Sequence, residues 1–366
     1  FLESTGIYHF PLFCYLVDCG FNASIINPII THSTKNGNIR KVKNDKIDSK
    51  GIAKLGLSKD IPVSQFPAKL VLELRSLTRK YYDLTDERSA HINKLKGDLH
   101  TVFPQYLDVF CDVTGKTSTM ILRQYGTPDK ILRGHKKTMI EKISKASRKG
   151  LAKASERYEK LCAAANAAKT FGCQIDSIYF NIFLTLDLVE KLDSALDSIL
   201  NRIRQLITFN KNEKFIQQIK LLNTIPGVGF LTAVTIMCEI GDFSAFRNPK
   251  QLFAYFGLDP EVNESGKFVG TQLHMSKRGS RIAHRAIFAV ALASIRTKRN
   301  GEGINPYLRK YYELKSGQKP KMVAIGAVMH KVCNIVFAVL RDEKAFELRS
   351  PEEHCKQYQR PALAAA

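Results

Sequence analysis

The chain has 366 residues and a formal net charge of +22, with 56 Lys and Arg against 34 Asp and Glu. A charge of this size indicates association with polyanions such as nucleic acids and says nothing about the fold. The eight cysteines form no C-x-x-C pair, so neither a zinc site nor a disulfide framework is indicated, and no apolar run reaches the roughly 18 residues of a membrane span.

The first 60 or so residues alternate strand and helix. Phe1-Leu2 has the character of a strand end, residues 6–19 carry apolar side chains at helical spacing, and residues 23–26 form a short strand closed by Asn27-Pro28. A polar stretch containing Lys41 and Lys43 then leads into a helix from about residue 44. This order is typical of half of an α/β layer.

Three acidic residues stand out in this Lys-rich segment: Glu3, Asp45 and Asp48. Asp45 and Asp48 are three residues apart, so a helix presents both carboxylates on one face. Glu3 follows directly on the first strand. Together the three carboxylates predict a site for a hard divalent cation such as Mg²⁺, which prefers a few carboxylates together with phosphate oxygens and water.

Long helices follow from Pro67. Two apolar stripes of alternating three- and four-residue spacing run over residues 70–102 and 189–206 and predict a coiled coil, formed as an antiparallel hairpin or with another copy of the chain. Between them lies a basic tract, which is either a solvated surface or a nucleic-acid contact. Its members are Arg133, His135, Lys136, Lys137, Lys142, Lys145, Arg148, Lys149 and Lys153.

Residues 221–233 are typical of a helix-hairpin-helix. Gly227 and Gly229 would let the backbone turn tightly and offer its N–H groups to a phosphate at the start of the next helix. The alternative is an ordinary tight turn between two helices. A short helix over residues 250–256 and an irregular strand pair over 257–274 are expected next.

The segment Met275 to Arg281 is the second chemical candidate. Ser280 is expected to cap a helix over residues 281–298. Ser276 would lie in the loop before it, where its hydroxyl could meet a phosphodiester. Lys277 and Arg278 could then stabilise the developing charge. Alternatively, both serines are caps, and the cations that only grip the nucleic-acid backbone are Arg278, Arg281 and Arg285. Helices over residues 305–315 and 322–340 complete the prediction.

Five motifs occur in a fixed order: Glu3-Ser4-Thr5-Gly6-Ile7-Tyr8-His9, Ile26-Asn27-Pro28, residues 40–48, Ile225-Pro226-Gly227-Val228-Gly229 and Ser276-Lys277-Arg278-Gly279. Together they resemble bacterial insertion-sequence transposases that join a RuvC-like DEDD domain to a serine-bearing C-terminal domain and are guided by a bridge RNA. The resemblance extends from residue 1 to about residue 348.

The resemblance implies roles for particular residues. Glu3, Asp45 and Asp48 correspond to three members of the acidic quartet that holds Mg²⁺, and Ser276 corresponds to a nucleophile that becomes joined to DNA. The implied site combines two protomers, base pairing with the guide RNA selects the DNA sequence, and the protein grips backbones. A homo-oligomer, a dimer or tetramer formed through the coiled coil, in the bacterial cytoplasm at the nucleoid is expected.

The expected fold is mostly α with a partial RNase H-like α/β N-terminal domain. Its parts are a partial RuvC-like domain (1–64), a helical coiled-coil region (65–210), a serine transposase domain with the helix-hairpin-helix (211–348) and a polar tail (349–366). In the resembled family the first Asp precedes the Glu-Ser-Thr-Gly motif, so the resemblance predicts an N-terminally truncated chain with an incomplete metal site.

Two other functions fit the same residues. The first is a junction-type nuclease that uses metal-activated water at the acidic cluster and no serine. The second is a basic helical protein that binds RNA or DNA and performs no chemistry. Loss of a covalent protein–DNA product in Ser276→Ala would separate the transposase from the nuclease. Binding of nucleic acid without cleavage would favour the binding protein.

Overall fold

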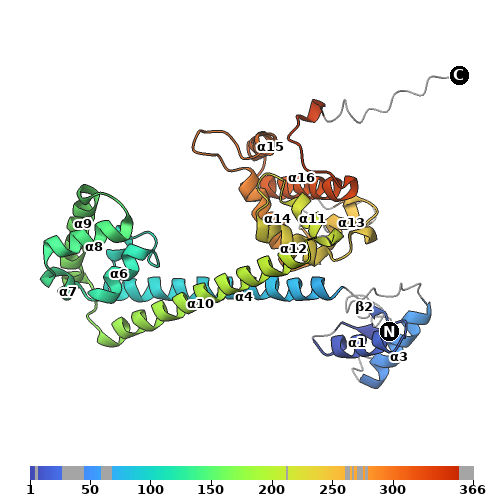
Figure 1. Cartoon of the computed structure of the whole chain (residues 1–366), viewed down its shortest axis with the longest axis horizontal. Helices are drawn as coiled ribbons and strands as arrows, with labels where there is room; N and C mark the ends of the chain where they lie inside the picture. Colours follow the sequence, from blue (N-terminus) through green and yellow to red (C-terminus); the bar gives the residue numbers. More distant parts are fainter. Residues whose placement is uncertain are drawn as a thin grey trace. The chain divides into compact units, whose positions relative to one another are not determined.

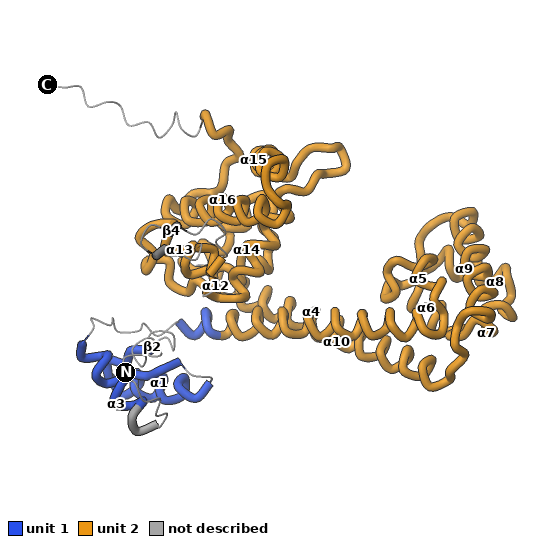
Figure 2. The backbone as a smooth tube through the Cα atoms, turned by 180° about the vertical axis from the view of Figure 1, so that it is seen from behind, with its two compact units in different colours: residues 1–72 blue, residues 73–366 orange. Residues whose placement is uncertain are grey.

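The computed structural model describes residues 1–4, 7–26, 45–58, 68–211, 213–259, 264–265, 268–269, 275–276 and 279–353, with the side chains of 45–47, 264–265 and 268–269 left out. The chain is divided into two compact units, residues 1–72 and 73–366 (Figure 2). The described part is mostly helical, as the sequence predicts.

The first unit contains the predicted strand, helix and strand. β1 (Leu2–Glu3) pairs in parallel with β2 (Ile25–Ile26), and α1 (His9–Asp18) connects them. The helix α3 (Asp45–Ser58) follows. It packs closely against the first residue of the chain, because a Cβ on Gly56 would lie 2.3 Å from the ring of Phe1. Phe13, Ile26 and Leu55 are buried in this unit.

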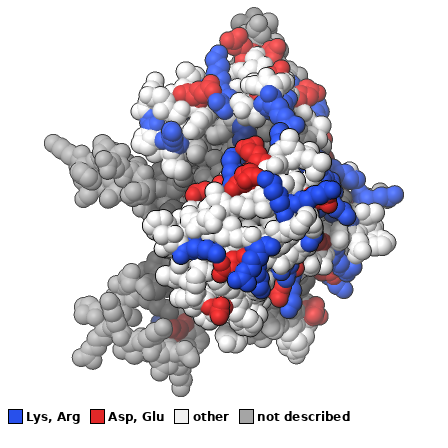
Figure 3. All heavy atoms as spheres, turned by 90° about the vertical axis from the view of Figure 1, so that its left-hand side faces the viewer, with Lys and Arg blue, Asp and Glu red and all other residues white. Residues whose placement is uncertain are grey.

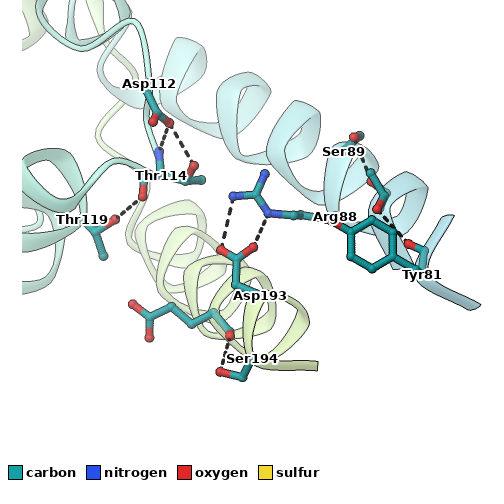
Figure 4. Close-up of polar contacts among 10 residues, drawn as sticks. Tyr81, Arg88, Ser89, Asp112, Thr114, Thr119, Asp193 and Ser194 are labelled. Atoms are coloured by element: carbon teal, nitrogen blue, oxygen red, sulfur yellow. Dashed lines mark hydrogen bonds and ion pairs between the residues drawn. The ribbon is translucent and has the colours of Figure 1, made fainter. Parts of the chain in front are cut away.

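Two 34-residue helices, α4 (Lys69–Val102) and α10 (Asp176–Phe209), run side by side in both backbone views (Figures 1 and 2). Arg88 on α4 forms a bidentate ion pair with Asp193 on α10, with Nε–Oδ1 and Nη2–Oδ2 distances of 2.5 and 3.2 Å (Figure 4). Near the other end of α4, the Tyr179 hydroxyl donates to the Val102 carbonyl. The partners on α10 move backward as α4 advances, so the pair is antiparallel and formed within one chain.

A small helical bundle connects these two helices. It consists of α5 (Tyr106–Val109), α6 (Lys116–Gln124), α7 (Pro128–Arg133), α8 (Lys136–Ser147) and α9 (Leu151–Phe171). Its core includes Tyr106, Ile121, Met139 and Leu161, and it also buries Leu95 and Leu99 of α4. The basic tract therefore belongs to a packed bundle, which the sequence pattern did not predict.

The last part of the second unit is a helical domain around α16. Its elements are α11 (Lys214–Leu222), α12 (Phe230–Ile240), the 3₁₀ helix η1 (Phe243–Ala245), α13 (Pro249–Tyr255), the antiparallel strands β3 (Glu264–Ser265) and β4 (Phe268–Val269), α14 (Arg281–Ser294), α15 (Pro306–Ser316) and α16 (Lys321–Asp342). α16 contacts α11, α13, α14 and α15. The predicted short helix, strand pair and final helices are confirmed.

Two predictions about this domain are wrong. The helix α14 ends at Ser294, four residues before the predicted end, because the chain turns back: Thr297 forms an isolated β-bridge with Gly303, and the Asn305 N–H donates to the Ser294 carbonyl. The expectation that no segment is long and apolar enough for a membrane span is also wrong for α16. More than half of its apolar stretch is buried in the domain, which makes α16 a core helix.

Candidate active site

Asp259 is placed by the turn that ends α13. Gly257 adopts a positive φ of 65°, which a glycine tolerates, and the Leu258 N–H donates back to the Phe253 carbonyl at 2.9 Å. Phe256 and Leu258 are fully buried. The turn therefore has a fixed conformation, and Asp259 is the next residue along the chain.

Two imidazoles hold the same turn. The Nδ1 of His284 on α14 lies 3.2 Å from the Phe256 carbonyl oxygen, and the Nε2 of His330 on α16 lies 2.9 Å from the Leu258 carbonyl oxygen. Each ring nitrogen can donate to its carbonyl, which sets the tautomer of a neutral imidazole. Helices from two other parts of the domain thus fix the backbone just before Asp259.

Ser276 is held by Asp259 at two points. The Ser276 N–H donates to the Asp259 carbonyl at 2.8 Å, and the Ser276 hydroxyl donates to Asp259 Oδ1 at 2.6 Å. Both residues are half-buried. Ser276 therefore caps no helix, and its Oγ lies against a carboxylate that comes from 17 residues earlier in the chain.

Ser280 has the other role that the sequence allowed. Its Oγ accepts from the Ala283 N–H at 3.2 Å, so Ser280 is the N-cap of α14, as predicted. The same hydroxyl donates to Glu239 Oε2 at 2.7 Å. Of the two serines in this loop, one caps the helix and the other contacts Asp259.

Glu239 anchors this loop to α4. Its side chain is 1% exposed and forms two hydrogen bonds with Arg79, at 2.8 and 2.9 Å. Burial alone would raise the pKa of Glu239, but the hydrogen bonds from Arg79 and Ser280 and the charges of Arg79 and Arg75 outweigh it, and the net shift lowers the pKa. Glu239 is therefore a charged structural group that joins α4, α12 and the start of α14.

Gly279 is required by a close backbone approach. The Ser280 N–H donates to the Tyr255 carbonyl at 3.1 Å, and a Cβ on Gly279 would lie 2.1 Å from that carbonyl oxygen. The Tyr255 hydroxyl in turn donates to the Glu239 carbonyl at 2.6 Å. Only glycine fits at position 279 without displacing the loop that carries the two serines.

The predicted nucleic-acid-binding cations have different surroundings. Arg281 is exposed at the start of α14. Arg285 pairs with Asp86 on α4 at 2.8 Å, and its guanidinium lies 4.8 Å from the centre of the Tyr82 ring. Arg285 thus contributes to the contact between α14 and α4. Four further predicted positions lie outside the described residues: Lys41, Lys43, Lys277 and Arg278.

The two glycines of the predicted helix-hairpin-helix also differ. Gly227 has a φ of 98°, and a Cβ there would lie 2.4 Å from Ser294 Oγ, which donates to the Pro226 carbonyl. Gly227 therefore packs against the end of α14. Gly229 is exposed at the N-terminus of α12, and a Cβ there would meet no atom within 4 Å. Gly229 has the more open surroundings of the two glycines.

The acidic residues lie in the first unit. Glu3 ends β1 opposite Ile26, Asp48 lies on α3, and Asp45 begins α3, with its side chain outside the described set. Among the side chains that are described, no group of three His, Cys, Asp or Glu could hold a metal ion. The residues nevertheless fit Mg²⁺ by donor chemistry, since carboxylate oxygens are its preferred protein ligands.

The basic tract is exposed on α7, α8, α9 and the turns between them. Lys136 pairs with Glu159, and Lys142 donates to Gln124. The face of the molecule that Figure 3 shows has Lys and Arg interspersed with Asp and Glu. The surface is therefore of mixed sign on this face and not a continuous basic patch.

Comparison with known families decides what kind of domains these are. Residues 1–104 match a transposase model named for the DEDD domain of IS110, and residues 219–313 match the transposase IS116/IS110/IS902 family. These two parts of the chain are thus similar to transposase domains of the IS110/IS116 family. The first match includes Glu3, Asp45 and Asp48, and the second includes Ser276.

Individual relatives agree with these transposase domains. An insertion element IS110 protein of Streptomyces coelicolor is 23% identical over 77% of this chain and 66% of its own length. An insertion element IS116 protein of Streptomyces clavuligerus is 24% identical over 84% of this chain and 74% of its own length. A pilin gene-inverting protein of Moraxella bovis is 29% identical over 48% of this chain and 52% of its own length.

Sequence reasoning missed two residues of this site, Asp259 and Glu239. Glu239 carried a signal, because it is the one charged residue in the apolar segment 230–240 and therefore required a buried partner. Asp259 carried none, because its relation to Ser276 appears only when the turn after α13 is folded.

Proposed function

We propose that this chain acts in DNA transposition through a covalent intermediate between Ser276 and DNA. The observation that carries the proposal is that the Ser276 hydroxyl caps no helix and instead donates to the carboxylate of Asp259, which follows a fixed turn. In the attack a bond forms between Ser276 Oγ and the phosphorus, and a bond from the phosphorus to a sugar oxygen breaks. The reverse reaction with another strand end rejoins the DNA.

The family matches support cutting and rejoining of DNA. A relative is named a pilin gene-inverting protein, and inversion of a gene requires that strands are cut and joined again. Glu3, Asp45 and Asp48 are the proposed ligands of Mg²⁺, which when bound would neutralise charge on a phosphate. The chain's own contribution is to position these carboxylates at the end of β1 and along α3.

Guide RNA and DNA are the proposed nucleic-acid partners, and base pairing with the guide RNA would select the DNA sequence. The proposed place of action is the bacterial cytoplasm, at the nucleoid. Arg281 and Gly229 are the described candidate contacts with open surroundings. The exposed lysines of α8 and α9 could add phosphate contacts that weaken as salt increases. Lys41, Lys43, Lys277 and Arg278 remain proposed contacts from the sequence.

A homo-oligomer formed through the long helices is also proposed. α10 exposes Phe180, Leu184 and Leu188 at intervals of four residues, with 62%, 46% and 43% of each side chain accessible. Such a row on one helix face suits pairing with a second copy. Light scattering should give the mass of a dimer or tetramer, and Leu184→Glu with Leu188→Glu should give a monomer. A monomeric wild-type chain contradicts this part of the proposal.

The chemical proposal is tested with the insertion element that encodes the chain. The purified protein is incubated with Mg²⁺, circular element DNA and RNA transcribed from the element's flanks, and protein joined to DNA is detected on a denaturing gel. Ser276→Ala should abolish the joined product. Ser244→Ala is the matched control, since Ser244 also donates to an aspartate at 2.6 Å but at the start of η1. Cleavage that persists in Ser276→Ala without joined protein contradicts the proposal and supports a nuclease that uses water.

A further inference from the structure

The bond between Ser276 and Asp259 differs from the other short Ser–Asp bond of this domain. Asp242 accepts from the Ser244 hydroxyl at 2.6 Å and from the Ser244 N–H at 2.9 Å, two residues away, and so caps the start of η1. Asp259 and Ser276 are 17 residues apart, and neither residue starts a helix. Helix capping therefore explains the first bond and does not explain the second.

Three other titratable groups that the structure describes around this turn are already engaged. His284 and His330 each place a ring nitrogen at a backbone carbonyl, and Glu239 is bonded to Arg79 and Ser280. Among the described residues, Asp259 supplies the acid or base atom that lies within hydrogen-bond distance of Ser276 Oγ. The position of that atom is fixed because the turn after α13 is held from both α14 and α16.

A serine hydroxyl is a weak nucleophile at neutral pH and gains from an adjacent group that takes its proton. The geometry needed is a heavy-atom distance of about 2.6–3.2 Å between the hydroxyl oxygen and the base. The Ser276 Oγ to Asp259 Oδ1 distance of 2.6 Å meets it. Because the hydroxyl donates its proton to Oδ1, the oxygen's lone pairs point away from Asp259.

We propose that Asp259 is the proton acceptor for Ser276, an inference that rests on the proposed function. As Ser276 Oγ forms its bond to the phosphorus, its proton passes to Asp259 Oδ1. The electron pair of the breaking phosphorus–oxygen bond goes to the departing sugar oxygen, which takes a proton from water. In the reverse step the protonated Asp259 returns its proton to Ser276.

The test compares Asp259→Asn with Asp242→Asn in the joining assay. The amide oxygen of asparagine still accepts the Ser276 hydrogen bond but does not take the proton, so the turn is kept. Formation of joined protein should slow by about 10²–10⁴-fold in Asp259→Asn, the usual contribution of a general base. Asp242→Asn should react as the wild type does. Thermal unfolding of the two variants controls for a loss of fold.

A second nucleophile separates proton transfer from positioning. Ser276→Cys supplies a thiol that ionises more easily and needs less help from a base. The effect of Asp259→Asn should therefore shrink to less than about tenfold in the Ser276→Cys background. An equal loss in both backgrounds would mean that Asp259 only positions residue 276, and this overturns the inference.

A probe without DNA keeps the inference distinct from the proposed function. A small fluorophosphonate should label Ser276 in the wild type: the Oγ–phosphorus bond forms, fluoride leaves with its electron pair, and the proton goes to Asp259. Labelling read by peptide mass spectrometry should fall at least tenfold in Asp259→Asn and not in Asp242→Asn. Equal labelling, or no labelling of Ser276, overturns the inference. Loss of DNA joining in Ser276→Ala together with unchanged joining in Asp259→Asn overturns it and leaves the proposed function standing.

Discussion

The carboxylates near the front of the chain lie on elements of regular secondary structure, whereas the loop with Ser276 is held by side chains from other segments. Glu3 and Asp48 lie on a two-residue strand and a single helix. The Ser276–Ser280 loop is tied to α4, α12 and α13 through Glu239, Tyr255 and Asp259. The comparison shows that a motif of similar length can lie on regular secondary structure in one domain and on a loop held by side-chain contacts in another.

Of the variants considered, the one that removes the ion pair between Arg79 of α4 and Glu239 should lower the free energy of unfolding most. Arg79→Ala leaves the buried carboxylate of Glu239 without its ion-pair partner and should lower the free energy of unfolding by about 3 kcal/mol. Arg88→Ala on the same helix is the control, since its partner Asp193 is 46% exposed, against 1% for Glu239 (Figure 4). It should cost at most about 1 kcal/mol.

Urea unfolding of both arginine variants checks this prediction. The Arg79 variant should also reduce joining of protein to DNA, because the Ser280 end of the loop depends on Glu239. Equal losses of stability in the two variants would contradict the structural role assigned to the buried pair.

A somewhat smaller loss of unfolding free energy is expected when Gly279 is replaced. A methyl group there would collide with the Tyr255 carbonyl, so Gly279→Ala should cost about 2 kcal/mol of unfolding free energy, as overpacking usually does. Gly229→Ala is the matched variant in open surroundings and should cost less than about 1 kcal/mol. Both values come from urea unfolding. A Gly279→Ala protein as stable as the wild type would show that the loop can shift freely.

The pH dependence of stability tests the charge on Glu239. Its pKa is lowered in the folded chain, so its contribution is fully present above the ordinary carboxyl pKa of 4.5 and is lost as the pH falls below that value through the lowered pKa. The difference in urea midpoint between wild type and Glu239→Gln should therefore be constant from pH 7 to pH 5 and shrink below pH 4.5. A difference that stays constant down to pH 3 contradicts the assignment.

The smallest change is expected in DNA affinity, from lysines on the surface of the bundle between the long helices. If Lys137, Lys145 and Lys149 contact phosphates, replacing all three by Gln should reduce the slope of log affinity against log salt for duplex DNA by about 0.9 per lost contact. Lys160, which pairs with Glu156, provides the control substitution Lys160→Gln. Fluorescence anisotropy at several salt concentrations measures the slope. An unchanged slope would make this tract a solvated surface only.

The sequence predicted those features that depend on local pattern. Helical spacing located α1, α3, α4, α10, α14 and α16, and the serine before the apolar run located the N-cap Ser280. The end of α14 was misplaced because a tertiary contact near residue 303, not a local signal, stops the helix.

The packed bundle of α5–α9 was not predicted from the sequence because lysines separate its core positions. Met139, Ile143, Tyr158 and Leu161 are buried, yet each lies among charged neighbours in the sequence. The pairs Ser276–Asp259 and Arg79–Glu239 were also not predicted, because they join residues that are 17 and 160 positions apart in the sequence. No periodicity or motif encodes such a pairing.

Peptide mass spectrometry of the joined product shows whether the Ser276 hydroxyl forms the bond to DNA. After nuclease digestion, we expect a nucleotide remnant attached to Ser276. A remnant on Ser280 or on any other residue, or cut DNA that carries no protein, would contradict it.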